Sequence, residues 1–267
     1  MTISKALTIA GSDTSGGAGL QADLKTFQEL SVYGMTAITV IVAQNPAADW
    51  NHDVYPLSLD VLEAQIETVL AGIGVDALKT GMLASAEVIA LVAKKIDQYN
   101  LKNVVIDPVL VCKGTDEVLH PETAIALAEV LAPRATVITP NLFEAKQLSG
   151  INIQSTEDMK KAAVAIHKLG AKNVLIKGGS KLGTATAVDV FYDGNAFDLL
   201  EAPKIATTYT HGAGCTTAAA ITAGLAKGLP VRQAVMEAKA FITAALRQSF
   251  PLNQYVGPTW HGAHRME

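Results

Sequence analysis

Thr210-His-Gly-Ala-Gly-Cys-Thr-Thr-Ala-Ala-Ala-Ile221 is a loop of small residues that runs directly into an alanine-rich helix. The first turn of a helix has backbone N–H groups without partners inside the helix, and the helix dipole makes that end positive. Such an end binds phosphate, or the charge that develops while a phosphoryl group moves. Gly212, Ala213 and Gly214 therefore form a candidate anion-binding loop.

Cys215 sits on the same turn as this loop. A helix N-terminus lowers the pKa of a cysteine and makes its thiol more reactive. An anion site beside an activatable thiol indicates group-transfer chemistry. The alternative is a glycine-rich cap in front of a buried helix, with Cys215 as a small core residue.

Before the loop, short β-rich runs alternate with longer helical stretches, and after it the sequence is helical. Predicted strands cover 6–10, 35–43, 77–80, 104–107, 135–139 and 174–177, followed by a hairpin of 188–192 and 196–200 around Asp193-Gly194. Predicted helices cover 20–30, 61–71, 86–96, 123–131, two segments between 142 and 168, 215–227 and 231–249. Continuous apolar strands alternating with helices predict an α/β fold: a mostly parallel central sheet flanked by helices on both faces.

Composition narrows the class of protein. The chain has 267 residues, 49% of them hydrophobic, and no linker or repeat divides it, so we expect one domain. The net charge of −4 and the lack of a Lys/Arg run argue against nucleic acid as a partner. No apolar run reaches the roughly 18 residues of a membrane span, and the first residues lack a signal-peptide core. With only two cysteines, a disulfide framework is not expected, and a cytoplasmic protein with reduced thiols fits best.

Polar and charged residues gather where the predicted strands end. They are Gly11-Ser-Asp13, Gln44-Asn45, Lys79-Thr-Gly-Met82, Asp107-Pro-Val109, Asn141 with Glu144, and Lys177-Gly-Gly179. Ligands of open parallel sheets bind beyond the carboxyl ends of the strands, so this set predicts one active site.

Each of these motifs also has a structural explanation. Asp13 could cap a turn, and so could Asp107. Asn141 could cap the next helix with Glu144 in the capping-box position, although Glu144 could equally hold Mg²⁺ through water. Lys177 could face polyphosphate or sit solvated beside a tight turn.

The histidines and the second cysteine, Cys112, are weaker candidates for site residues. Cys112-Lys113-Gly114 could be a loop over the site, or Cys112 could be a packing residue. The histidines show no metal-ligand spacing. His52, His120 and His167 are interpreted as surface or loop residues, whereas His211 borders the anion-binding loop.

In combination these motifs resemble the hydroxymethylpyrimidine/phosphomethylpyrimidine kinases of the ribokinase superfamily. The resembling segments are Leu7–Asp13, Ser15–Phe27, Lys79–Met82, Thr139–Glu144, Lys177–Gly179 and His211–Cys215. The resemblance implies that residues 1–267 form a single ribokinase-like kinase domain, with a parallel sheet flanked by helices. It also implies transfer of the ATP γ-phosphoryl group to an alcohol, with Mg²⁺ as cofactor.

Within this group the chain most resembles the pyridoxal kinases that carry two cysteines. The resembling segments are Trp50-Asn-His52, Asp107–Gly114, His211–Cys215 and Phe250–Pro258. The resemblance implies phosphorylation of the 5-hydroxymethyl group of pyridoxal. It makes Cys215 the base that accepts the alcohol proton, as a thiolate with a pKa near 7 could. Cys112 would hold the aldehyde as a hemithioacetal.

The resemblance also assigns the remaining site residues. The vitamin pocket would be lined by Gly11, Asp13, Ala18, Val42, Gln44, Met82, Val109, Cys112 and His211. The ATP site would use Asn141, Lys177, Gly178, Gly179 and Lys239, and Mg²⁺ would be supported by Asp107 and Glu144. Gly212, Ala213 and Gly214 would stabilise the transferring phosphoryl group. The expected partners are pyridoxal, ATP and a second copy in a homodimer.

Gln44 favours a second candidate. A glutamine at this place resembles the hydroxymethylpyrimidine kinases, where it recognises the amino group of the pyrimidine, whereas the two-cysteine pyridoxal kinases tend to have an apolar residue. The alternative is therefore a hydroxymethylpyrimidine/phosphomethylpyrimidine kinase of thiamin biosynthesis, or a bifunctional enzyme. A vitamin-binding protein without catalysis is the alternative from another class.

Overall fold

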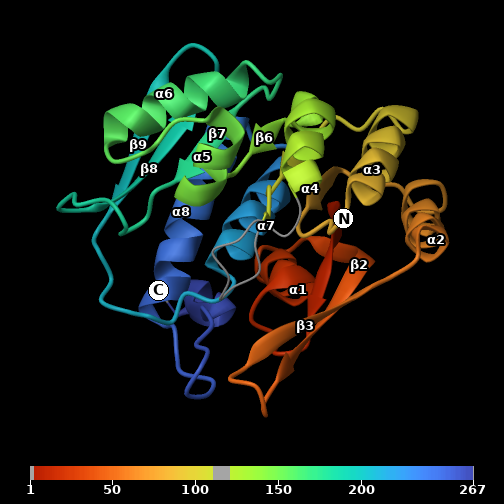
Figure 1. The fold of residues 1–267 in the computed structure, drawn as a ribbon, viewed down its shortest axis with the longest axis horizontal. Helices are drawn as coiled ribbons and strands as arrows, with labels where there is room; N and C mark the ends of the chain where they lie inside the picture. The colour runs from red at the N-terminus through yellow and green to blue at the C-terminus, as the bar shows by residue number, and fades with distance from the viewer. Residues whose placement is uncertain (1–2, 111–120, 267) are drawn as a thin grey trace.

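The computed structural model describes residues 3–110 and 121–266. Through the described part runs one sheet with strand order β3-β2-β1-β4-β5-β6-β7-β8-β9 (Figure 1). The strands are β1 (Lys5–Asp13), β2 (Tyr33–Asn45), β3 (Asn51–Pro56), β4 (Ala77–Thr80), β5 (Val104–Ile106), β6 (Val137–Ile138), β7 (Val174–Lys177), β8 (Ala187–Tyr192) and β9 (Phe197–Ala202).

The centre of the sheet is parallel, and its two edges are antiparallel. Strands β2, β1, β4, β5, β6 and β7 pair in parallel, while β3 runs antiparallel to β2, and β8 and β9 continue antiparallel from β7. The central strands are apolar throughout, as in β5, where all residues are buried. Strands covered on both faces need this pattern, so the predicted α/β, mostly parallel sheet is confirmed.

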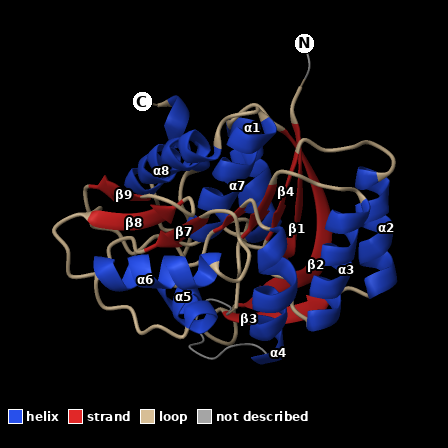
Figure 2. Ribbon diagram, turned by 90° about the horizontal axis from the view of Figure 1, so that it is seen from above, coloured by secondary structure: helices blue, strands red, loops and turns tan. Residues whose placement is uncertain are grey.

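Helices cover both faces of the sheet (Figure 2). They are α1 (Gly19–Glu29), α2 (Leu59–Leu70), α3 (Ala86–Gln98), α4 (Pro121–Ala126), α5 (Leu142–Ser149), α6 (Thr156–His167), α7 (Ala213–Ala226) and α8 (Val231–Arg247), with short helical turns η1 (Leu127–Leu131), η2 (Ala132–Arg134) and η3 (His261–Arg265). One buried apolar cluster joins the sheet to α2, α3, α5 and α6, and a second joins it to α1, α7 and α8. The two clusters are the two cores that hold the sheet between its helical layers.

Helix α7 is the most deeply buried helix of the site. Every residue from Thr216 to Ala226 is buried, and the helix packs against α1, α8 and the sheet. Its alanines let these backbones approach closely, and their burial supplies a continuous apolar contact. The loop before α7 therefore leads into a helix that is packed on several sides.

Three elements differ from the predictions. β3 has no predicted counterpart, because its sequence NHDVYP is mostly polar and half exposed. The helix predicted over 123–131 is α-helical only to Ala126 and continues as the π-helical turn η1, while the strand predicted over 135–139 shortens to Val137–Ile138. Pro133 in η2 ends the helical run between them, since proline cannot donate a backbone hydrogen bond.

The C-terminal segment folds back onto the loop before α7. The His211 N–H donates to the Gly257 carbonyl at 3.0 Å, and the Thr259 N–H donates to the His211 carbonyl at 3.3 Å. The Tyr255 ring of this segment stacks on Trp50 next to β3, with centroids 6.1 Å apart. The described residues contain no helix that is both long and apolar enough to cross a membrane.

Candidate active site

A cavity of about 690 Å³ opens where the parallel strands end. It brings together the predicted site residues that the structure describes: Gly11, Asp13, Ala18, Val42, Gln44, Met82, Asp107, Val109, Asn141, Glu144, Lys177, Gly178, Gly179, His211, Gly212, Ala213, Gly214, Cys215 and Lys239. Cys112 lies outside the described residues. Because these residues come from distant parts of the chain, the common carboxyl edge of the sheet is what unites them.

The anion-binding loop is shaped by a glycine at the start of α7. Gly212 is the N-cap residue and has a left-handed φ of +79°. A Cβ at this position would lie 1.8 Å from the Gly17 carbonyl oxygen, so a side chain would force the two loops apart. The loop is a glycine cap in front of a buried helix, and it also lines the cavity with the first turn of that helix.

At one end of the cavity, hydrogen-bond donors surround the carboxylate of Asp13. We call this the vitamin end, after the vitamin pocket that the sequence predicts there. The carboxylate accepts from the backbone of Ser15 (2.9 Å) and Ala18 (2.7 Å), from the Ser15 hydroxyl (2.8 Å), and from Gln44 Nε2 and His211 Nε2 (2.7 Å each). Burial alone would raise the pKa of Asp13, but the hydrogen bonds from His211 and Ser15 hold it well below its usual range. Asp13 is therefore a turn cap, as one interpretation predicted, and also an anionic hub of the site.

The Gln44 side chain is oriented by this hub. A carboxylate only accepts hydrogen bonds, so the atom of Gln44 that faces Asp13 is its NH₂ group. The carbonyl oxygen of Gln44 is then its acceptor for other groups at the cavity wall.

At the other end, which we call the phosphate end, a lysine lies between two buried carboxyl groups. Lys177 Nζ is 2.8 Å from Asp107 Oδ1, and Thr139 donates to the same oxygen at 3.2 Å. A Cβ on Gly214 would lie 3.3 Å from Lys177 Nζ, so this ammonium group is next to the anion-binding loop. The Lys177 side chain is only 13% exposed and is ion-paired with Asp107, so the interpretation of a lysine solvated beside a turn is wrong.

Glu144 forms the capping box predicted for it and also faces the cavity. Its Oε2 accepts from the Asn141 N–H at 2.8 Å, while the Asn141 side chain accepts from the Glu144 N–H at 2.9 Å. Burial raises the pKa of Glu144 to about 7, with Lys177 opposing this shift and Asp107 adding to it. For Asp107, burial also favours the neutral acid, but Lys177 and Lys79 outweigh it and lower the pKa.

These two carboxyl groups suit a hard cation. Mg²⁺ prefers a few carboxylates together with waters and phosphate oxygens, and a cation here would oppose both the burial and the Asp107 charge that raise the Glu144 pKa. Within residues 3–110 and 121–266, no group of three or more His, Cys, Asp or Glu residues could hold a metal alone.

Lys239 reaches the cavity from α8, where it pairs with a residue of β8. Its Nζ lies 2.7 Å from Asp189 Oδ2, and Asp189 Oδ1 accepts from the Gly179 N–H at 3.0 Å. Asp189 therefore ties Lys239 to the Lys177-Gly-Gly179 turn, close to the phosphate end.

Cys215 lies between the two ends and is half-buried. Burial raises the pKa of its thiol to about 11, while the charge of Lys79 and a hydrogen bond from the Gly19 N–H act in the opposite direction. The expected thiolate with a pKa near 7 is therefore wrong for the structure without ligands. Desolvation outweighs the helix dipole here, because α1 and the sheet pack around the sulfur.

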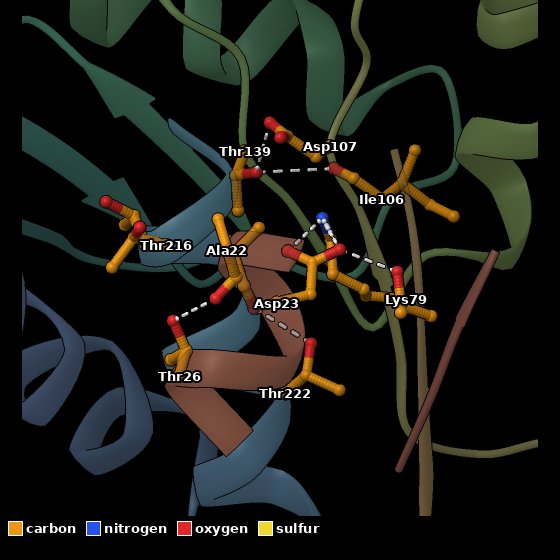
Figure 3. Close-up of polar contacts among 12 residues, drawn as sticks. Ala22, Asp23, Thr26, Lys79, Ile106, Asp107, Thr139, Thr216 and Thr222 are labelled. Carbon is orange, nitrogen blue, oxygen red and sulfur yellow. Dashed lines mark hydrogen bonds and ion pairs between the residues drawn. The ribbon is translucent and has the colours of Figure 1, made fainter. Parts of the chain in front are cut away.

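The predictions placed Lys79 at this edge of the sheet without giving it a role, and they missed His52, Asp189 and Asp23 as site residues. Lys79, His52 and Asp189 line the cavity, and Asp23 pairs with Lys79 below it (Figure 3). His52 belongs to the half-exposed strand β3 and lines the cavity, so its assignment as a loop residue is wrong. For Lys79 the sequence did hold a signal, since a lysine inside the short apolar strand ALKT needs a buried partner.

A parallel α/β sheet whose strand ends carry a glycine-capped helix, lysines and buried carboxyl groups defines a small-molecule kinase of the α/β class. The family model described as phosphomethylpyrimidine kinase matches residues 13–260, and the chain belongs to this family.

Relatives of known identity cover the whole chain. The pyridoxine kinase of Bacillus subtilis (strain 168) is 62% identical over 267 residues, which are 100% of this chain and 98% of that protein. The crystal structure of an ADP complex of Bacillus subtilis pyridoxal kinase has a TM-score of 0.97 at 62% identity and covers 100% of both chains. The pyridoxal kinase from Staphylococcus aureus in complex with AMP-PCP and pyridoxal has a TM-score of 0.93 at 49% identity, covering 99% of this chain and 95% of that one.

Proposed function

We propose that the chain transfers the γ-phosphoryl group of ATP to the 5-hydroxymethyl group of pyridoxal, giving pyridoxal 5'-phosphate. The observation that carries the proposal is one cavity that joins the Asp13 network to the lysine-rich phosphate end across the Cys215 loop. A relative with a TM-score of 0.93 holds pyridoxal and an ATP analogue together. The substrate class and the co-substrate follow from these two facts.

In the proposed reaction, the 5-hydroxyl oxygen attacks the γ-phosphorus, its proton passes to the thiolate form of Cys215, which becomes a neutral thiol, and the bond between this phosphorus and the ADP oxygen breaks. The backbone N–H groups of Gly214 and Cys215 would stabilise the transferring group, because the first turn of a helix has N–H groups without partners inside the helix. The Ala213 N–H, expected to do the same, donates to the Thr210 carbonyl at 3.1 Å. Lys177 lies beside the same turn and would neutralise phosphate oxygens. Asp107 and Glu144 would hold Mg²⁺, which supplies positive charge to the ATP phosphates when bound.

Nucleotide binding would use the residues around the Gly178-Gly179 turn. Asn141 pairs with Lys177 through an isolated β-bridge, and Lys239 reaches the same turn through Asp189. We propose that these residues contact ATP rather than the vitamin, because they line the cavity on the side of Lys177.

Hydroxymethylpyrimidine is the second candidate substrate, and Gln44 is the observation that favours it. Because Nε2 of Gln44 donates to Asp13, its carbonyl oxygen is the atom that could accept from the pyrimidine amino group. We propose that pyridoxal is the better substrate and that hydroxymethylpyrimidine is also phosphorylated at a measurable rate.

The test is a side-by-side turnover comparison of pyridoxal, pyridoxine and hydroxymethylpyrimidine, with wild type and Cys112→Ala. A hemithioacetal at Cys112 needs an aldehyde, so the variant should lose far more activity with pyridoxal than with pyridoxine. Equal losses would return Cys112 to a packing role. If the wild-type kcat/KM for hydroxymethylpyrimidine is well above that for pyridoxal, the second candidate is the function instead.

We also propose that the protein works in the cytoplasm as a homodimer. Exposed apolar side chains gather on β2, β3 and the start of α2, including Ile41 and Tyr55, which are paired across the two strands. Light scattering should give twice the chain mass for wild type and a smaller mass for Tyr55→Asp. A monomeric wild type at micromolar concentration would contradict the dimer.

A further inference from the structure

Two of the groups that donate to Asp13 come from segments that are far apart in the chain. Gln44 lies near the end of β2, His211 lies in the loop before α7, and each places a nitrogen 2.7 Å from the Asp13 carboxylate. The shape of the vitamin end therefore depends on the distance between the β2–β3 hairpin and this loop. A third segment, residues 250–259, contacts both of them.

The β2–β3 hairpin carries two residues of the cavity wall. Gln44 of β2 is the register partner of His52 on β3, and both line the cavity. Opposed residues of an antiparallel pair project from the same face, so the two side chains face the vitamin end together. The ring centroids of His52 and His211 are 6.5 Å apart. A shift of the hairpin would therefore move both residues relative to His211.

The turn of this hairpin holds Trp50 in an unusual conformation. Asp49 and Trp50 have φ angles of +48° and +64°, in the left-handed region that residues other than glycine rarely adopt. The Trp50 N–H closes the turn by donating to the Asn45 carbonyl at 3.0 Å. Among residues 3–110 and 121–266, the buried indole N–H of Trp50 has no acceptor. A strained turn persists where its surroundings hold it, and for the indole these surroundings supply a stacked ring instead of a hydrogen bond.

Tyr255 of the C-terminal segment is that stacked ring. It lies on the indole of Trp50 with 15° between the planes and 6.1 Å between the centroids, and its hydroxyl donates to Asp49 Oδ1 at 3.4 Å. The segment is folded around Asn253, whose Oδ1 accepts from the N–H groups of Tyr255 and Val256 at 2.9 Å each. Tyr255 is therefore presented to the hairpin by an ordered turn.

A few residues later, the same segment is joined to His211. Backbone hydrogen bonds of 3.0 and 3.3 Å pair His211 with Gly257 and Thr259. A Cβ on Gly257 would lie 2.2 Å from the Tyr209 ring, so the segment packs on this loop as closely as a residue without a side chain allows. Contacts thus run in a closed ring from Asp13 through the hairpin and the C-terminal segment back to Asp13.

We propose that Tyr255 is a positioning residue for the vitamin: by stacking on Trp50 it fixes the hairpin at the distance from His211 that the vitamin needs. Gln44 and His52 take their places with the hairpin. The inference rests on the proposed function, which assigns the vitamin to this end of the cavity. Tyr255 is not among the residues that line the cavity, so its effect would pass through the hairpin and appear as a cost of ordering the empty pocket.

The experiment compares Tyr255→Ala and Tyr255→Phe with wild type in the full chain. Phenylalanine keeps the stacked ring and removes the hydrogen bond to Asp49, whereas alanine removes both. Tyr33→Ala is the matched control, because Tyr33 is also an exposed tyrosine and lies at the other end of β2 from Gln44. Calorimetric titration would give Kd for pyridoxal, hydroxymethylpyrimidine and ADP, and steady-state turnover would give kcat and KM.

Tyr255→Ala should bind each vitamin that wild type binds about 3- to 10-fold more weakly, which is the factor that one aromatic pair contributes. The vitamin KM should rise by the same factor with kcat unchanged. Kd for ADP should stay the same, because the residues of the phosphate end belong to other strands and helices. Tyr255→Phe and Tyr33→Ala should match wild type. Unchanged vitamin affinity in Tyr255→Ala would overturn the inference, and so would an equal loss of ADP affinity, which would indicate a general loss of structure.

Tryptophan fluorescence tests the stacking itself without any ligand. The chain has two tryptophans, so a Trp260→Phe parent reports Trp50 alone. In this parent, acrylamide should quench Trp50 more strongly after Tyr255→Ala than after Tyr255→Phe. Equal quenching would mean that the ring does not hold the indole, and would overturn the inference.

These outcomes can be told apart from a failure of the proposed function. Wild-type turnover of pyridoxal decides that function. The ratio of variant to wild type for whichever vitamin is bound, together with the quenching of Trp50, decides the role of Tyr255. Light scattering should give the same mass for Tyr255→Ala as for wild type. A smaller mass would overturn the inference, since the loss of affinity would then act through the association of two copies.

Discussion

The two ends of the cavity balance their charges in different ways. At the vitamin end, one carboxylate, Asp13, receives five hydrogen bonds, and its pKa is held well below the usual range. At the phosphate end, Lys177 lies between the carboxyl groups of Asp107 and Glu144, and burial raises the pKa of Glu144 to about 7. At the vitamin end one carboxylate is surrounded by donors, whereas at the phosphate end two buried carboxyl groups share the charge of Lys177.

This difference indicates that the vitamin end is the preorganised part of the site. Donors fixed around Asp13 hold the vitamin pocket in shape before substrate arrives, which lowers the entropic cost of binding. The phosphate end is built for groups that arrive with the nucleotide, since a cation there would restore the charge of Glu144. The predictions below change one end or the boundary between them.

The largest effect is expected from removing the hub of the vitamin end. Asp13→Ala would leave the buried ring N–H of His211 and the partly buried amide of Gln44 without their acceptor. Breaking a buried, charged interaction of this kind costs about 3–5 kcal/mol. Urea unfolding should therefore show a loss of this size, and a loss below about 1 kcal/mol would contradict the role of Asp13 as a hub.

The same prediction has a pH dependence with a definite sign. The pKa of Asp13 in the folded protein lies below the value of 3.8 in an unfolded chain. Its contribution to stability is therefore complete above pH 3.8 and is lost as the pH falls toward the folded-state value. In Asp13→Asn the acid-induced loss of unfolding free energy should be smaller than in wild type by this contribution.

The next largest effect concerns the boundary between the two ends. Cys215→Ala should lower kcat by about 10²-fold or more, because general-base loss falls in this span. The affinity for ADP should change little, since the phosphate end keeps its lysine and carboxyl groups. Near-normal turnover in a folded Cys215→Ala protein would leave the anion-binding loop as the catalytic element and end the base assignment.

Gln44 sharpens the comparison at the vitamin end. Gln44→Met removes the carbonyl acceptor and leaves pyridoxal with an apolar wall, so hydroxymethylpyrimidine turnover should fall selectively, by roughly 5- to 100-fold. Steady-state kcat/KM with both substrates is the measurement. If both fall by the same factor, Gln44 acts through the shape of the Asp13 network and not through recognition.

The smallest effect is expected at the phosphate end, from a change of Glu144 that alters the Mg²⁺ requirement. Glu144→Gln keeps an acceptor for the Asn141 N–H but removes the charge, so half-maximal activity should need roughly tenfold more Mg²⁺. Glu157→Gln is the control, since Glu157 also lies in the first turn of a helix but pairs with Lys160 at the surface. An unchanged Mg²⁺ titration with lower thermal stability would mean that Glu144 serves only the capping box.

The sequence predicts those parts of the site that follow from local patterns. Apolar runs locate the parallel strands, and polar residues at their ends place Asp13, Asp107 and Lys177 at one edge of the sheet. The spacing of Asn141 and Glu144 predicts a capping box, and the structure confirms it. Each of these inferences needs only neighbouring residues and the rule for strand ends.

Other features depend on packing between distant segments. The Lys79–Asp23 pair joins β4 to α1, and only the packed structure shows that the two side chains meet. The pKa of Cys215 depends on how closely α1 and the sheet surround its sulfur, which no local pattern describes. Asp189 lies on an antiparallel strand, where the rule for the ends of parallel strands does not apply.

The backbone pairing of His211 with Gly257 and Thr259 bears on the order of events during synthesis. His211 directly precedes the anion-binding loop, and its backbone partners belong to a segment that is translated more than forty residues later. Since bacterial and eukaryotic ribosomes add about 5–20 residues per second, for some seconds the nascent chain contains the residues of strands β1 to β9 while the loop still lacks these backbone partners. A ribosome-bound chain that stops before Gly257 should fold much of its core and still turn over no ATP, so activity marks full-length translation.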